Sequence, residues 1–68
     1  MTYEKMLADS LPYNIDVSDN YSVFLEIAFQ KAVYFWGPEI AEHLFSYQED
    51  FVSELIAEWQ RRVSLFLL

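Results

Sequence analysis

The sequence has no cysteine, one glycine, two prolines and only four Lys or Arg residues. The absence of cysteine excludes disulfide bonds and thiolate metal sites. With so little Gly and Pro, few boundaries between structural elements are marked. The shortage of basic groups argues against direct binding to nucleic acid, because Lys and Arg are the groups that bind phosphate. It argues equally against docking on an anionic membrane surface.

Long apolar runs are also scarce. The longest mostly apolar stretch, residues 23–36, contains Glu26, Gln30 and Lys31, so it is too short and too polar to span a bilayer. The first five residues lack the basic start and apolar segment of a signal peptide. We therefore expect a cytoplasmic protein with no membrane association.

What the chain has in excess is apolar side chains and acidic charge. Apolar residues make up 54% of its 68 residues, and eleven carboxylates give a net charge of −7. A chain of this length forms one domain, residues 1–68, and buries only about 60% of its unfolded surface. The surplus apolar side chains are expected to meet a partner. The charge favours solubility and attraction to a basic partner.

Two short segments open the predicted fold. Apolar residues at helical spacing predict a helix over residues 3–10, with Thr2 as its N-cap. The helix should end before Pro12, because a residue that precedes proline avoids the α region. Residues 12–17 are expected to be extended, with Ile15 and Val17 in the core.

A central helix is predicted over residues 20–36. Ser18, Asp19 and Asn20 are N-cap candidates, and Gly37-Pro38 stops the helix. The helix is apolar almost all round, so it should be buried on more than one side. Its one narrow polar strip consists of Ser22, Glu26 and Gln30.

The remaining residues predict one long helix, residues 38–67, because a single apolar stripe keeps its phase throughout. The alternative divides it at Ser46, since Ser46 and Glu49 fit a capping box. A helix of this length spans about 44 Å and the central helix about 26 Å. The mismatch favours an antiparallel dimer. The predicted fold is all-α: a small helical hairpin or bundle with a short N-terminal, a central apolar and a long C-terminal helix.

Acidic residues lie off the apolar stripe of that helix and form a candidate partner-binding face: Glu39, Glu42, Asp50, Glu54 and Glu58. Asp50, Glu54 and Glu58 form a row with about 6 Å between neighbours, close to the spacing of phosphates along a nucleic-acid strand. The face is either a solvated surface, with Glu58 paired to Arg61 or Arg62, or a recognition strip.

Aromatic residues at helical spacing are expected in the core, namely Phe24, Phe35, Trp36 and Trp59. An apolar C-terminal end is unusual, because chain ends are normally polar and frayed. The side chains predicted to meet a second copy or a partner are Phe29, Val33, Trp36, Leu65, Phe66 and Leu68.

Signals for catalysis or metal binding are weak. His43 is the only histidine, whereas helical zinc and di-iron motifs need two or a repeated Glu-x-x-His. Asp9-Ser10-Leu11 resembles the phosphopantetheine site of carrier proteins, but Pro12 follows at once, where a helix is required. We expect no cofactor, no metal and no enzymatic activity.

The predicted function is that of an acidic helical protein-binding module. In size and charge alone it is similar to bacterial immunity proteins, antitoxins and phage-encoded inhibitors, which indicates an inhibitor or adaptor that binds a basic protein surface. The alternatives are a nucleic-acid-mimic inhibitor and a purely structural subunit. In each case the chain is expected to be a homodimer or part of an obligate hetero-complex.

Overall fold

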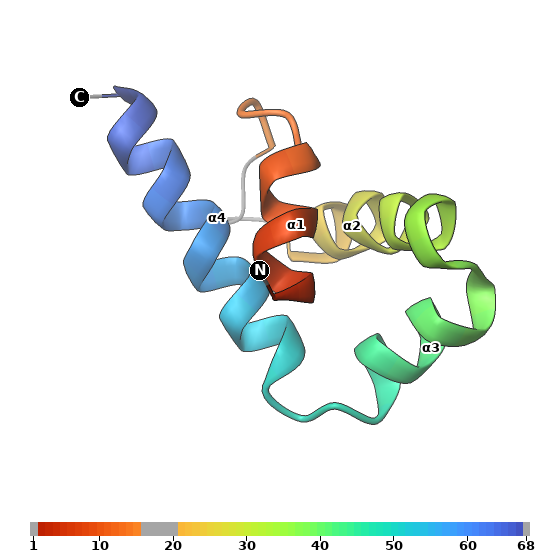
Figure 1. Cartoon of the computed structure of the whole chain (residues 1–68). Coiled ribbons are helices and arrows are strands. Elements are labelled where there is room, and N and C mark those ends of the chain that lie inside the picture. Colours follow the sequence, from red (N-terminus) through yellow and green to blue (C-terminus); the bar gives the residue numbers. More distant parts are fainter. Residues whose placement is uncertain (1, 16–20, 68) are drawn as a thin grey trace.

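The computed structural model describes residues 2–15 and 21–67, with side chains up to Leu65. Within these ranges the chain forms four helices and no strand: α1 (Tyr3–Ser10), α2 (Tyr21–Trp36), α3 (Pro38–Ser46) and α4 (Phe51–Leu67). Figure 1 shows α1 lying between α4 and α2. Helix α1 packs mainly on α4, and α2 packs mainly on α3. The predicted all-α class is confirmed.

Helix α1 begins and ends where the local sequence predicts. The Thr2 hydroxyl accepts a hydrogen bond of 3.3 Å from the backbone N–H of Lys5. Leu11 is extended, as expected before Pro12. The connector was predicted to be extended, but over residues 12–15 the chain turns. The backbone N–H of Ile15 donates a hydrogen bond of 3.5 Å to the Pro12 carbonyl. Ile15 is buried as predicted; Val17 and the N-cap candidates Ser18, Asp19 and Asn20 lie outside the described residues.

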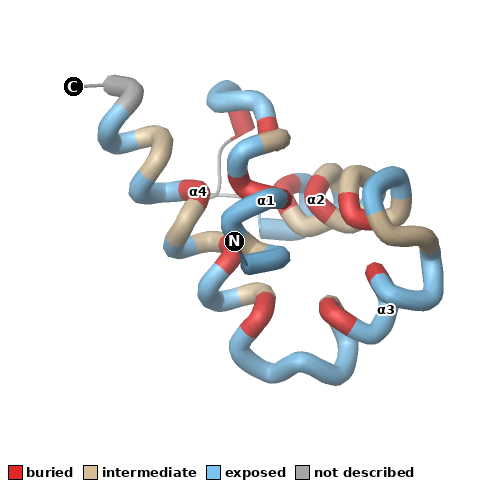
Figure 2. The backbone as a smooth tube through the Cα atoms, in the orientation of Figure 1, coloured by how far each residue is buried: buried red, intermediate tan, exposed pale blue. Residues whose placement is uncertain are grey.

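Helix α2 confirms the predicted central helix. Its buried side chains are Phe24, Ala28 and Ala32, which stand four residues apart and share one face. Half-buried apolar residues flank that face on both sides, whereas the predicted polar strip is exposed. Figure 2 shows the buried positions of α2 alternating with intermediate and exposed ones. The helix is therefore buried along one face with half-buried flanks, and the predicted burial on more than one side is corrected, because Val23, Tyr34 and Phe35 are exposed.

The predicted long helix is wrong, because the chain divides it into α3 and α4. Ser46 is the last residue of α3 and does not cap the next helix, which begins at Phe51. The turn between them is held by backbone hydrogen bonds from Tyr47 to His43 (2.9 Å) and from Phe51 to Gln48 (3.1 Å). The turn lets α3 pack on α2 while α4 packs on α1. The helix-length argument for a dimer no longer applies.

Aromatic rings join the helices within the core. Phe24 of α2 lies 5.3 Å from Trp59 of α4, measured between ring centroids. Phe45 of α3 lies 5.4 Å from Phe29 and 5.3 Å from Phe51. The buried core is completed by small and aliphatic side chains from all four helices and the connector: Leu7, Ala8, Leu11, Ile15, Ala28, Ala32, Ala41, Leu44 and Leu55.

Candidate protein-binding surface

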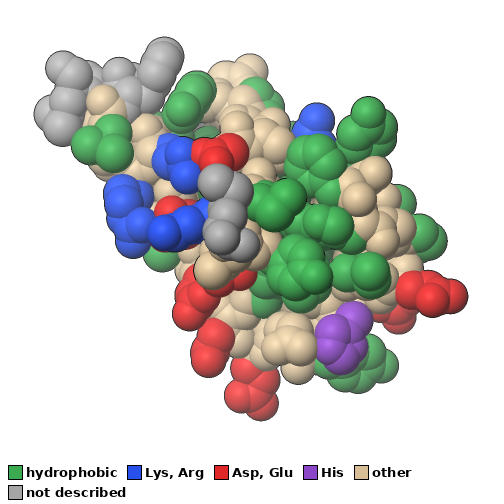
Figure 3. Space-filling model, viewed as in Figure 1, with side chains coloured by type: hydrophobic (Ala, Val, Ile, Leu, Met, Phe, Trp, Pro, Cys, Tyr) green, Lys and Arg blue, Asp and Glu red, His purple; other side chains and the backbone are tan. Residues whose placement is uncertain are grey.

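The predicted acidic face separates into two groups. Glu39 and Glu42 are exposed on α3, whereas Asp50 and Glu54 lie at the start of α4. In Figure 3 carboxylates appear along the lower edge of the molecule and again at its right-hand edge. Glu58 is half-buried and forms an ion pair with Arg61, which is one of the two partners predicted for it. The turn after α3 separates the acidic residues of α3 from those of α4, since it ends the straight helix that would have carried all five residues on one face.

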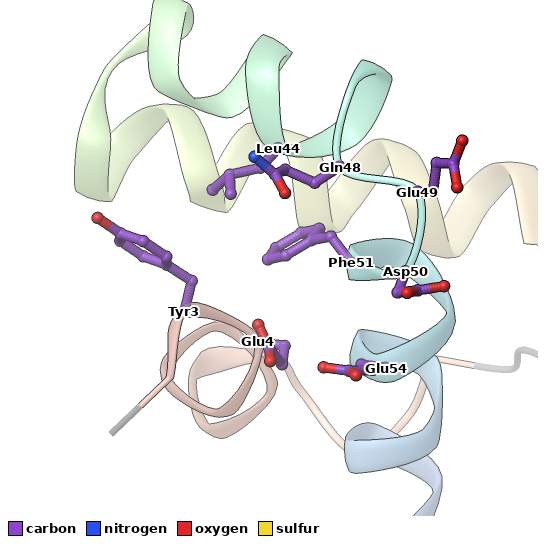
Figure 4. Close-up of a pocket in the computed structure, with 8 residues that line it drawn as sticks. All are labelled: Tyr3, Glu4, Leu44, Gln48, Glu49, Asp50, Phe51 and Glu54. Atoms are coloured by element: carbon purple, nitrogen blue, oxygen red, sulfur yellow. The ribbon is translucent and has the colours of Figure 1, made fainter.

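A cleft of about 370 Å³ opens between the first turn of α1, the end of α3 and the start of α4. Its described lining contains four carboxylates and neither Lys nor Arg. Figure 4 shows Glu4 and Glu54 facing each other across it from α1 and α4. The complete lining is Tyr3, Glu4, Leu44, Gln48, Glu49, Asp50, Phe51 and Glu54.

The proximity of Glu4 raises the proton affinity of Glu54. A hydrogen bond from Glu54 to Glu4 and the repulsion between the two carboxylates raise the pKa of Glu54 above its usual 4.5. Slight desolvation and the charges of Asp50 and Glu58 act in the same direction. The folded chain therefore holds carboxylates together against their mutual repulsion.

Glu4 is the residue that sequence reasoning missed. It belongs to the first turn of α1, where a carboxylate is expected for the helix dipole alone. It also lines the neighbouring hollow, of about 330 Å³, with Lys5, Glu58 and Arg61. Its partner Glu54 lies fifty positions away in the chain, so no local pattern marks the pair.

Of the six side chains predicted to contact a partner, four are described, and three of these pack inside the molecule. Phe29 and Val33 are half-buried against the core. Trp36 is also half-buried and lies 4.9 Å from Tyr3, edge to face. Leu65 is 67% exposed, whereas the side chains of Phe66 and Leu68 lie outside the described residues. Phe35, predicted in the core, is exposed beside Trp36.

Three of the four basic residues belong to α1 and α4, whereas Lys31 belongs to α2. Figure 3 shows one group of Lys and Arg side chains over α4, away from the lower acidic edge, and a further basic side chain at the upper right. Arg62 forms an ion pair with Asp9 of α1, and Arg61 pairs with Glu58. Both arginines are thus engaged within the chain, and the carboxylates around the cleft have no cation in its lining.

The side chains considered for metal binding and for phosphopantetheine attachment, His43 and Ser10, make local contacts. The His43 ring Nε2 lies 2.9 Å from the Gln48 side-chain amide, and no metal-binding cluster occurs among the described residues. Ser10 donates a hydrogen bond of 2.7 Å to the Leu7 carbonyl at the end of α1. None of the helices in the described ranges combines the length and apolar character needed to cross a membrane.

Comparison with known proteins gives no relative: no family model matches the sequence, and neither the curated proteins nor the solved structures provide a match.

Proposed function

We propose that this protein binds a basic surface of another protein, as an inhibitor or adaptor, and that the acidic cleft is its point of contact. The observation that carries the proposal is the pair Glu4 and Glu54, held together by two helices among further carboxylates. Like charges in contact destabilise a fold. A Lys or Arg from a partner would relieve that repulsion and would be attracted from a distance.

The two alternatives from the sequence draw different support. A nucleic-acid mimic needs an even strip of free negative charge, whereas Glu58 is neutralised by Arg61. A structural subunit, including a homodimer, is supported by Tyr34 and Leu65, which are 81% and 67% exposed. In this proposal the protein has no catalytic step and no cofactor, and it acts in the cytoplasm, as expected from the sequence.

The test is capture of a partner from a lysate of the source organism at low salt, followed by association kinetics with that partner. The double variant Glu4→Gln/Glu54→Gln should slow association, because the attracting charge is lost. Its matched control is Glu39→Gln/Glu42→Gln, which removes the same charge from the acidic group on α3. Wild-type association of the cleft variant at low salt would overturn the proposal.

A further inference from the structure

The lining of the cleft is both apolar and acidic. Its apolar lining consists of Tyr3, Leu44 and Phe51, and its acidic lining consists of Glu4, Glu49, Asp50 and Glu54. Figure 4 shows Tyr3 on the side of the cleft away from Glu49 and Asp50, with the Phe51 ring between them. A volume of about 370 Å³ falls within the range of clefts that take a ligand group. An occupant therefore meets apolar surface and negative charge together.

The apolar lining continues outside the cleft as an aromatic face made of Tyr3, Trp36 and Phe35. The Tyr3 and Trp36 rings lie 4.9 Å apart, and the Trp36 and Phe35 rings lie 5.7 Å apart. Tyr3 belongs to both surfaces, because it lines the cleft and is itself 48% exposed. Tyr and Trp are the residue types enriched where binding energy is concentrated.

We infer that the cleft binds a basic segment of a partner protein that carries an aliphatic or aromatic side chain between Lys or Arg residues. The apolar side chain would lie against Tyr3, and the flanking cations would meet Glu4 and Glu54 on one side and Glu49 and Asp50 on the other. This inference rests on the proposed function and specifies the chemistry of its partner.

The negative charge of the lining disfavours two other occupants, a second copy of the chain and a phosphate-bearing ligand. A second copy of the chain brings a further net charge of −7, and its two C-terminal arginines are already paired with Glu58 and Asp9. Phosphate-bearing ligands, including nucleic acids and anionic lipids, are repelled by the four carboxylates. A cationic segment is the occupant whose charge is complementary to the lining.

Two short peptides test the inference. Both carry the same Lys and Arg residues; one has Leu and Phe between them, and the other has Ser at those positions. Titrated into isotope-labelled wild-type protein, the apolar peptide should bind about tenfold more tightly and shift the resonances of Tyr3, Glu4, Gln48 and Asp50. Equal affinity for the two peptides would overturn the inference. The proposed function would then still be tested by association with the captured partner. Shifts confined to another surface, or no binding of either peptide, would also overturn the inference.

Paired variants test the role of Tyr3. Tyr3→Ala should remove the preference for the apolar peptide, so that the two affinities converge. Tyr21→Ala is the matched control, since Tyr21 also begins a helix and is 51% exposed, and it should keep the preference. Tyr3→Phe retains the ring and should behave as wild type, which separates a lost contact from a damaged fold. A preference that survives in a folded Tyr3→Ala protein would contradict the inference.

Discussion

Trp59 is the residue on which the core of this small protein most depends. It is only 3% exposed and packs against Phe24, joining α4 to α2. Its indole N–H is buried without a hydrogen-bond partner among the described residues. Its contribution is therefore one of packing, since the polar group gains nothing from burial.

Replacing Trp59 by Ala should lower the free energy of unfolding by about 3–5 kcal/mol, comparable to the whole stability of a domain this small. Trp59→Phe should cost clearly less, because it keeps a ring beside Phe24 and removes the unpaired N–H. Denaturant unfolding followed by circular dichroism measures both. A Trp59→Ala protein as stable as the wild type would mean that Trp59 is not packed in this core.

The Glu4 and Glu54 pair makes stability depend on pH. Because folding raises the pKa of Glu54, the folded state favours its protonated form. The resulting stabilisation is complete below the usual value of 4.5 and is lost as the pH rises through the folded-state value. At neutral pH the ionised pair is a source of repulsion.

Glu54→Gln should therefore melt at a higher temperature than the wild type at neutral pH, and the difference should shrink as the pH falls towards the usual carboxyl value. Thermal melts over that range provide the measurement. Glu26→Gln, on the exposed strip of α2, is the control and should show no such trend. If Glu54→Gln lowers the melting temperature at neutral pH, the two carboxylates do not repel each other as described.

At the scale of elements, Gly37 controls how α2 is joined to α3. Its φ of +91° and ψ of 161° lie where only glycine is comfortable. It accepts the hydrogen bond from the N–H of Ala41 over 3.1 Å and donates its own N–H to the Val33 carbonyl over 2.8 Å. One residue thus ends one helix and begins the next, and Pro38 follows at the first helical position.

Gly37→Ala should destabilise the fold by about 1–3 kcal/mol through backbone strain alone, since an added Cβ meets no atom within 4 Å. A chemically synthesised chain with D-alanine at this position is the matched control: the same methyl group suits a positive φ, so stability should be kept. Equal melting temperatures for the L-Ala and D-Ala proteins would show that the backbone at residue 37 does not need a positive φ.

At the scale of the whole molecule, charge and apolar surface favour opposite responses to salt. Salt screens the attraction between the acidic cleft and a basic partner, so that complex should weaken as salt is raised. Self-association through exposed apolar residues such as Leu65 opposes the net charge of −7. Screening reduces that repulsion, so any homodimer should strengthen with salt.

Sedimentation at micromolar concentration tests the homodimer directly. We expect the dimer fraction to rise with salt and to fall in Leu65→Ser, which removes one exposed apolar side chain. A monomer near 8.1 kDa at every salt concentration, with no partner present, would eliminate the homodimer and leave the complex with another protein.

The sequence by itself determined the parts of the fold that depend on neighbouring residues. Thr2 caps α1, the Leu11-Pro12 step ends it, and Gly37-Pro38 separates α2 from α3. In each case the cause lies within about one helical turn: a hydroxyl reaches a free N–H, or a ring or a missing side chain sets the backbone angles. The all-α class follows from the same periodic pattern.

Tertiary structure decided the rest, because the contacts involved join segments far apart in the chain. The apolar stripe of residues 38–67 has the same phase whether or not the helix breaks, and only packing of α3 on α2 and of α4 on α1 requires the turn at residues 47–50. That turn and that pairing also bring Glu54 to Glu4 and place Tyr3 against Trp36. The cleft exists only where three helices meet, so no local pattern along the chain could have revealed it.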